Sequence, residues 1–303
     1  MDLKKVENKL ESLVKIENKV RNDKNILLID IIKQNSLLNF YVNNALTSQE
    51  MILLLKQHYN IKTSLITLEN KSFSFINKLN NFLFQKRDLW IYVTEEQEFA
   101  TDSYSRYEQH ILKTAKLKQA DFISIGSRAS KFCKENKLNL IYEIDSENRD
   151  LEVCWKLTQI IKFLFSEQNY ASLHCVINSN KNKQGSFTIL PLSKFDLDSL
   201  VETKQEINLP DIKNIKIYPS IDQYLLTQID NFLITSINSL LVESSFYKAK
   251  NQLIKTNKTI NEVEEEIKKI KKKIIRIKRE KEIEEIVLLT SNNKKFLLRG
   301  GVN

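Results

Sequence analysis

Residues 253–279 read LIKTNKTINEVEEEIKKIKKKIIRIKR, and their hydrophobic spacing decides the fold. Apart from one threonine, apolar residues recur in alternating steps of three and four at Leu253, Thr256, Ile260, Val263, Ile267, Ile270, Ile274 and Ile277. Glutamates precede lysines by four positions at Glu264–Lys268 and Glu265–Lys269, an order that stabilises the exposed surface of a helix. The stretch therefore predicts a long helix with one narrow apolar side that packs on a second helix.

This helix has a recognisable start. Pro219 precedes Ser220, which can act as the N-cap, and Gln223 stands at the capping-box position. The first turns carry a broader apolar surface, which predicts burial on more than one side: Tyr224, Leu225, Ile229, Phe232, Ile237, Leu240 and Leu241. We place the helix at residues 220–292 and a basic tail at 293–303. A helix of about 70 to 75 residues would extend roughly 110 Å.

The N-terminal residues carry a matching pattern. Leu3, Val6, Leu10, Leu13 and Val20 follow the same spacing, with a glutamate at the one missing heptad position. We therefore expect an N-terminal coiled-coil helix at 1–60 that pairs antiparallel with the C-terminal helix.

Residues 61–87 are expected to connect this helix to the next domain. This segment contains a strand-like run at Thr63–Leu68 and a short helical pattern at Phe73–Phe84.

Strand and helix patterns alternate in residues 88–200. Short runs rich in β-branched and aromatic residues occur at Leu89–Thr94, Asp121–Ile125, Leu138–Ile144, Leu173–Asn178 and Ser186–Leu190. Helical patterns separate most of them, at Asp102–Leu117, Ser127–Lys137 and Asp150–Phe165. The fold class is therefore α/β: a small Rossmann-like parallel sheet attached to a long antiparallel coiled coil of the terminal helices. A linker at 201–219 joins the two parts.

The composition excludes several classes of protein. The chain of 303 residues has only 4 Gly and 3 Pro, too few for an all-β fold, and its glycines do not have the spacing of a Walker A loop or a dinucleotide fingerprint. We therefore expect no bound cofactor and no ATP hydrolysis by this chain alone. Its 3 Cys lack a C-x-x-C spacing, which makes a zinc site improbable and suits reduced thiols.

The sequence contains no apolar run of the roughly 18 residues that a membrane span needs, and no secretory signal at its start. We expect a cytoplasmic protein. The net charge of +9 permits an anionic partner without selecting one.

The features that could carry chemistry have simpler explanations. The lysines and arginines of residues 268–279 are typical of the solvated outside of a coiled coil, although they could also contact acidic residues of a surrounding ring. Stacking aromatics are absent from that block, which argues against nucleic acid. The turn at Gly126 could bind an anion, but such turns more often only require a small residue. His58, His110 and His174 lie on distant segments, which disfavours a metal site or histidine-based catalysis.

Five short motifs occur in the same order as in a known family. They are Leu3–Leu13 against the pattern LxxIKxRIxSV, Ile123–Phe132 against a strand ending in IGSKG, Val176–Lys181 against hVxNKF, Ile189–Leu192 against LLPL, and Glu282–Val287 against the end of ITQEhxEIV. Together with the expected architecture, they make the chain resemble the γ subunit of F-type ATP synthases over nearly its whole length.

The chain also departs from that family. Residues 95–100 read EEQEFA where the family has DRGLCGG, and residues 243–250 read ESSFYKAK where it has SExxxRMxAM. These differences suggest a diverged member whose contacts with the driven element and with the ring have changed.

The resemblance implies a function. Such a chain would be the non-catalytic central shaft of a rotary motor, held in a hexameric ring of α- and β-like P-loop ATPase subunits, with an ε-like subunit or another driven element at its α/β domain. The end of the C-terminal helix, around Ile283 to Leu289, would lie deepest in the ring. The residues expected to contact the ring are Leu3, Val6, Leu10, Leu13, Arg276, Lys278, Arg279, Glu282, Ile283, Ile286 and Val287. The complex would lie at the inner face of the cell membrane.

Two alternatives stay open on sequence alone. One is the shaft of a specialised F1-like ATPase that drives another movement, such as motility, in place of proton transport. The other is a coiled-coil scaffold that does not rotate. An independent enzyme is the weakest reading, because no nucleophile, base or set of metal ligands is visible.

Overall fold

The computed structural model describes residues 3–59, 87–95, 104–115, 119–144, 151–167, 170–181, 185–201 and 216–299, without the side chains of 151–153 and 291–299. The expected strand at Thr63–Leu68 and helix at Phe73–Phe84 lie outside the described residues. The same holds for Glu96–Ala100, most of the expected linker at 201–219, and residues 300–303 of the expected basic tail.

Two long helices lie near the ends of the chain: α1 (Leu3–Tyr59) and α6 (Ile221–Arg299). The backbone N–H of Gln223 donates to Ser220 Oγ at 3.2 Å, so Ser220 caps α6 as expected. The helix continues to Arg299, past residue 292, where the sequence pattern placed its end. Both helices contribute to two compact units, which we call the helical unit (1–31 and 249–303) and the domain unit (32–248).

In the helical unit, the two helices pack side by side along the apolar repeat. Ile270, Ile274 and Ile277 are buried against Val6, and three partly buried leucines of α1 extend the cluster: Leu3, Leu10 and Leu13. Lys278 Nζ lies 3.2 Å from Glu7 Oε1, and Arg21 forms an ion pair with Glu264. Because residue numbers rise along α1 as they fall along α6 in these pairs, the helices run antiparallel.

The domain unit is built on a five-stranded sheet with the order β3-β2-β1-β4-β5. Its strands are β1 (Arg87–Val93), β2 (Ala120–Ile125), β3 (Asn139–Ile144), β4 (Tyr170–Val176) and β5 (Phe187–Leu190). The first four are parallel, as the alternation of strands and helices predicted, but the further strand β5 is antiparallel to β4, so the sheet as a whole is mixed and not purely parallel. Residues 177–186 are too few for the helical crossover that a parallel neighbour requires.

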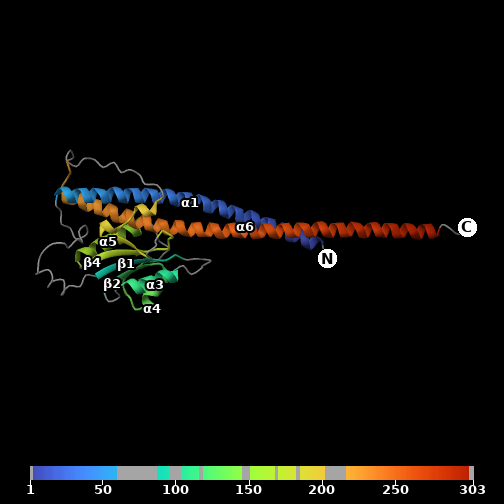
Figure 1. Ribbon diagram of the computed structural model, residues 1–303, viewed down its shortest axis with the longest axis horizontal. Coiled ribbons are helices and arrows are strands. Elements are labelled where there is room, and N and C mark those ends of the chain that lie inside the picture. The colour runs from blue at the N-terminus through green and yellow to red at the C-terminus, as the bar shows by residue number, and fades with distance from the viewer. Residues whose placement is uncertain are drawn as a thin grey trace. The chain divides into compact units, whose positions relative to one another are not determined.

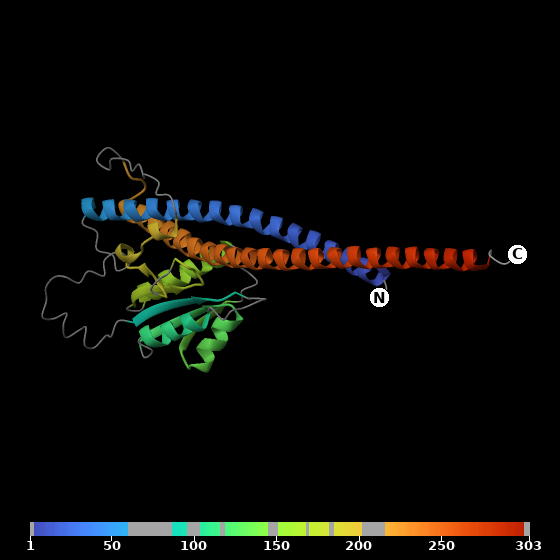
Figure 2. The ribbon, with the colours of Figure 1, turned by 45° about the vertical axis from the view of Figure 1, so that its right-hand side comes forward.

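Helices cover both faces of this sheet (Figure 1). On one face, α3 (Tyr104–Thr114) and α4 (Ser127–Glu135) bury an aromatic cluster around Trp90, Tyr92 and Phe122. On the other face, α5 (Leu151–Glu167) packs together with residues of α1 and α6 over Leu89, Ile91 and other strand residues (Figure 2). The long helices therefore form part of the domain's own hydrophobic core.

Candidate interaction sites

The end of α6 exposes a cluster of large apolar side chains. Ile283, Ile286, Val287, Leu288 and Leu289 are each between 58% and 66% exposed. They follow the last buried seam residue, Ile277, and every described side chain from 278 to 290 is exposed. We call residues 283–289 the apolar tip.

The apolar tip has no single apolar side. At about 100° per residue, its five apolar side chains are distributed around the helix with no gap wider than about 100°. An amphipathic helix that rests on one surface has a single apolar stripe, whereas a helix with apolar residues on all sides is normally enclosed. Glu284 and Glu285 occupy the two widest gaps, so a partner on one flat side of the helix would leave some of the apolar side chains exposed.

The predicted ring contacts fall into two groups. Leu3, Val6, Leu10 and Leu13 face α6 in the seam of the helical unit, so helix pairing already occupies their apolar side. Ile283, Ile286 and Val287 are exposed at the tip beside the charged Glu282. The structure thus leaves the tip, and not the N-terminal leucines, available as an apolar contact surface.

The basic residues just before the tip are also exposed. Arg276 Nε donates to Glu280 Oε1 at 2.8 Å within α6, and Lys278 pairs with Glu7 of α1. Arg279 is exposed as well. Ion pairs this exposed contribute about 1 kcal/mol or less, so these residues form a solvated charged surface next to the apolar tip.

The turn at Gly126 is explained by close packing. Gly126 has φ of +98°, and a Cβ there would lie 2.3 Å from the carbonyl oxygen of Thr94. Thr94 Oγ1 also accepts a hydrogen bond at 3.0 Å from the backbone N–H of Ala129, in the first turn of α4. The turn therefore requires glycine for the strand–helix junction, in agreement with the simpler of the two interpretations.

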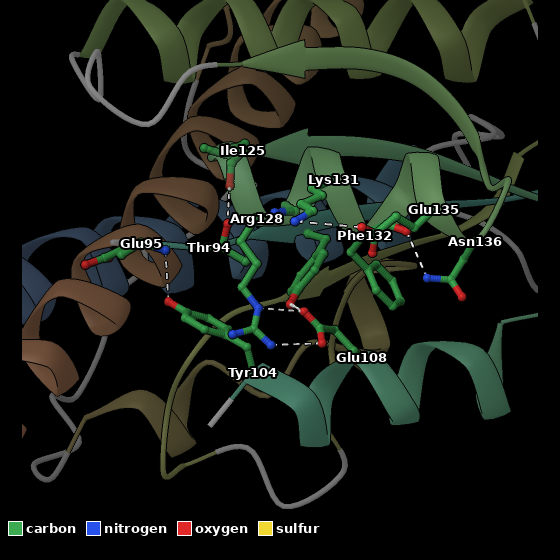
Figure 3. A network of polar contacts seen from close by, with 12 residues as sticks. Thr94, Glu95, Tyr104, Glu108, Ile125, Arg128, Lys131, Phe132, Glu135 and Asn136 are labelled. Carbon is green, nitrogen blue, oxygen red and sulfur yellow. Dashed lines mark hydrogen bonds and ion pairs between the residues drawn. The ribbon is translucent and has the colours of Figure 1, made fainter. Parts of the chain in front are cut away.

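Arg128 holds α4 against α3 through a charged pair (Figure 3). Its Nε and Nη2 donate to the two carboxylate oxygens of Glu108 at 2.8 and 3.0 Å, and its guanidinium lies over the ring of Tyr104. The Tyr104 hydroxyl in turn accepts from the backbone N–H of Glu95 at 2.9 Å. This network fixes Glu95, the second residue after β1.

At the other end of the strands, where each of the four parallel strands begins, one buried carboxylate contacts residues of the other three. Asp121 on β2 accepts hydrogen bonds from Arg87 on β1, from Asn139 on β3 at 2.6 Å and from Tyr170 on β4 at 2.5 Å. Burial alone would raise the pKa of Asp121, but the hydrogen bonds from Arg87, Tyr170 and Asn139 outweigh it and lower that pKa below its ordinary value. Sequence reasoning placed Asp121 in a strand but did not identify this role.

The fold brings two of the three histidines near each other: His110 and His174 interact electrostatically, and each contacts a hydroxyl at β5, of Ser186 and Thr188 respectively. His58 is on α1, His110 on α3 and His174 on β4, and burial lowers the pKa of both His110 and His174. All three cysteines are buried, and burial raises the pKa of Cys133 and of Cys175 to about 12, so these two are poor nucleophiles. Among the described residues, no group of His, Cys, Asp and Glu could hold a metal ion.

Sequence reasoning also missed the contacts between α6 and the ends of β1 and β4. Glu243 and Lys248, noted only as part of a departure from a family motif, form ion pairs with Lys181 and Glu95. Glu243 lies within an apolar stretch and has 1% of its side chain exposed. A buried carboxylate needs a partner, so a glutamate within an apolar stretch of the helix was the sequence signal that could have predicted this ion pair.

By length and composition alone, one helix in the described part of the chain could cross a membrane, within Ile221–Thr290. Half of its most apolar window is buried inside the protein, as in the core helices of soluble proteins.

These features define a mostly helical protein with two long terminal helices and a small mixed sheet of five strands. No protein-family model matches the chain. It is 44% identical over 295 residues to Uncharacterized protein UU050 of Ureaplasma parvum serovar 3 (strain ATCC 700970), an alignment that covers 97% of this chain and 95% of the relative. The chain belongs to the same family as UU050.

Three of the solved structures that the chain matches are of ATP synthases. A chain in the OSCP/F1/c-ring structure of the Euglena gracilis mitochondrial enzyme has a TM-score of 0.47 and 9% identity, covering 99% of this chain and 96% of that chain. A chain in the central stalk/c-ring structure of the Tetrahymena thermophila enzyme has a TM-score of 0.49 and 12% identity, covering 79% and 98%. A chain in the Euglena rotor structure has a TM-score of 0.44 and 9% identity, covering 92% and 98%.

Proposed function

We propose that the chain is the γ-like central shaft of an F1-type rotary ATPase. In this role, the helical unit is a coiled coil held in a ring of α- and β-like P-loop subunits, and the domain unit attaches to the driven element. The chain carries torque and catalyses no reaction. Its place is in the cytoplasm, peripheral at the inner face of the membrane.

The single observation that carries this proposal is the apolar tip. Its five large side chains are spread around α6, with Glu284 and Glu285 in the two widest gaps between them, so a partner must contact the helix from several sides to bury them all. Complete burial of one such side chain contributes about 1.5–3 kcal/mol, so an enclosing collar would gain several kcal/mol before the costs of association.

The order of elements supports the same conclusion. Two long helices from opposite ends of the chain pack antiparallel, and an α/β sheet lies between them in the sequence. The motifs that resemble the γ family occur in that order, and several fall on matching elements: Ile123–Phe132 spans the end of β2 and the start of α4, and Ile189–Leu192 spans the end of β5.

A ring also explains how such a contact would do work. Ring subunits in different nucleotide states present different surfaces to an asymmetric helix pair. Each hydrolysis step then changes the orientation of lowest free energy, which couples the catalytic sites to rotation.

The test is purification of the tagged chain from its native cells, with mass spectrometry of its partners and an ATPase assay. We expect P-loop subunits in the stoichiometry of a ring, together with ATPase activity. The double variant Ile286→Asp/Val287→Asp should recover at least tenfold less of these subunits, because it places charges where the collar needs apolar contact.

The matched control is Ile254→Asp, which places a charge at a 67% exposed isoleucine of the same helix outside the tip and should leave recovery within about twofold. Circular dichroism should show the same helix content in both variants. A chain that arrives alone, or without ATPase activity, would refute the shaft.

The remaining co-purified proteins identify the driven element. An ion-translocating rotor would bring membrane subunits with the complex, and a motor for another movement would not. The family motif DRGLCGG is replaced in residues 95–100, which favours an altered connection at the domain unit. We therefore propose a specialised F1-like ATPase as the second candidate, ahead of a scaffold that does not rotate.

A further inference from the structure

The carboxyl ends of β1 and β4 are a distinctive place in this sheet. The chain leaves β1 toward β2 on one side and returns later to place β4 on the other side of β1. In open α/β sheets, the crevice between two such strands is the usual place for a ligand. Here, side chains of α6 contact the residues that follow both strands.

On the side of β4, a buried glutamate of α6 is held by two residues. Glu243 Oε1 accepts a hydrogen bond from Ser179 Oγ at 2.6 Å, and Lys181 Nζ lies 3.4 Å from Glu243 Oε2. Lys181 also donates to the carbonyl oxygen of Leu200 at 2.6 Å and lies 5.9 Å from the ring centroid of Phe246 on α6.

Ser179 is itself fixed from the opposite face of the sheet. Its carbonyl oxygen accepts from the Tyr107 hydroxyl at 2.7 Å, and its backbone N–H donates to that hydroxyl at 3.2 Å. Tyr107 is on α3 and is 1% exposed. The group that binds Glu243 is therefore held rigidly by the domain.

On the side of β1, the charges are reversed. Glu95 accepts from Ser245 Oγ at 3.4 Å, and Lys248 Nζ lies 3.7 Å from Glu95 Oε2. The Glu95 side chain is 8% exposed, and its backbone N–H donates to Tyr104 (Figure 3). Glu95, two residues after β1, and Ser179, three residues after β4, are thus both bound to α3 as well as to α6.

The two sets of contacts are made from nearly opposite sides of α6. At about 100° per residue, Glu243 and Phe246 point to one side of α6, and Ser245 and Lys248 point to a side about 160° away. The ends of β1 and β4 therefore hold the helix from two directions. Rotation of α6 about its own axis would break both contacts at once.

The charge pattern also selects one rotational setting. The helix presents an acid to Lys181 and a base to Glu95. A half turn would bring Glu243 toward Glu95 and Lys248 toward Lys181, and like charges in partly buried positions repel. The arrangement therefore favours the observed orientation and disfavours the opposite one.

We propose that Glu243–Lys181 and Lys248–Glu95 form a torsional clamp that fixes the rotation of α6 relative to the α/β sheet. The clamp occupies the position where related sheets hold a ligand. Its use in passing torque from helix to domain rests on the proposed function, but its existence does not.

Hydrogen exchange of the isolated full-length protein tests the clamp without any ring subunit. We expect Glu243→Gln to speed exchange at least tenfold in α6 peptides covering residues 236–250, with helix content unchanged. Lys181→Met should do the same. The double variant should add less than twofold to either single one, because the two changes remove the same ion pair. Additive effects of the two changes would overturn the proposal.

Charge exchange at the more exposed pair tests the rotational setting. Glu95→Lys should speed exchange in the same peptides about fivefold, and Glu95→Lys/Lys248→Glu should bring it back to within twofold of the natural protein. Failure of the double variant to restore protection would show that these charges do not select an orientation.

The matched control is Lys162→Met. It removes the 2.6 Å ion pair between Lys162 on α5 and Asp230 on α6, outside the clamp. It should leave exchange in residues 236–250 unchanged, and a change as large as that of Lys181→Met would overturn the clamp. If the clamp is confirmed but no ring co-purifies, the proposed function alone fails.

Discussion

Two stretches of helix α6 are rich in large apolar residues, yet their surroundings are opposite. In the domain unit, Leu225, Ile229, Phe232, Leu233 and Leu240 are 3% exposed or less, because the sheet, α5 and α1 cover them. In the helical unit, the five apolar residues of the tip are all at least 58% exposed. The first stretch is covered by other parts of the chain, whereas the proposed function assigns the second to a partner outside it. One helix thus combines a buried apolar surface with an exposed one.

The largest expected effect is in the covered stretch. Phe232 is fully buried, with its ring 6.3 Å from that of Phe195 in an edge-to-face arrangement. Phe232→Ala should lower the free energy of unfolding by about 3–5 kcal/mol, because it removes buried area and leaves a cavity. Urea unfolding followed by circular dichroism measures this.

The control for that experiment is Leu226→Ala on the same helix, where the side chain is 46% exposed. Its cost should stay below about 1 kcal/mol. Equal losses from the two variants would contradict the assignment of this stretch to the core.

A second, smaller effect concerns the sheet that covers this stretch. Asp121 accepts from Arg87, Asn139 and Tyr170, so Asp121→Asn should cost about 2–3 kcal/mol near pH 7. The pKa of Asp121 is lowered in the folded state, so its stabilisation is complete above its unfolded pKa of about 4 and is lost as the pH falls through the folded pKa.

As the pH falls from about 5 to about 2, the free energy of unfolding of Asp121→Asn should therefore decrease less than that of the natural protein. The variant lacks the carboxylate that becomes protonated in this range. Urea unfolding at several pH values gives, for each protein, the slope of the free energy of unfolding against pH. Parallel slopes for the two proteins would show that Asp121 does not link the sheet to acid sensitivity.

The pattern of α6 was readable from the sequence because it is local. The buried positions of residues 260–277 are those of the apolar repeat, and Ser220 caps the helix where the sequence indicated. Strand and helix runs were recognisable for the same reason, since each depends on neighbours within a few positions. Residues 283–289 were singled out only through the family resemblance, not through this repeat.

The rest depends on residues far apart in the chain. The partners of Asp121 are 18, 34 and 49 positions away, and Glu243 lies 64 positions from Ser179. The direction of β5 depends on the length of the connection before it, which a strand pattern does not contain. Periodicity identifies which side of an element is buried, but it does not identify what covers that side.

The third effect lies in the seam of the helical unit, between the covered and the exposed stretches. Ile274 is 8% exposed and packs with the α1 residues around Val6. Ile274→Ala should cost about 1–2 kcal/mol, less than a usual core truncation, because only two helices line the seam. Hydrogen exchange in peptides covering residues 263–280 should rise about tenfold. Unchanged exchange there would mean that the helices do not pair through this repeat in solution.

The smallest effect on stability is expected at the apolar tip, and this result would distinguish the two stretches most clearly. Ile286→Asn/Leu289→Asn should change the free energy of unfolding by less than about 0.5 kcal/mol, because neither side chain is buried in the isolated chain. The same change should weaken recovery of the enclosing subunits at least tenfold, since two polar groups would be buried without partners. Urea unfolding and co-purification measure the two quantities separately. A loss of stability comparable to that of Phe232→Ala would mean that the tip is already covered by this chain. That result would contradict the proposal of an enclosing partner.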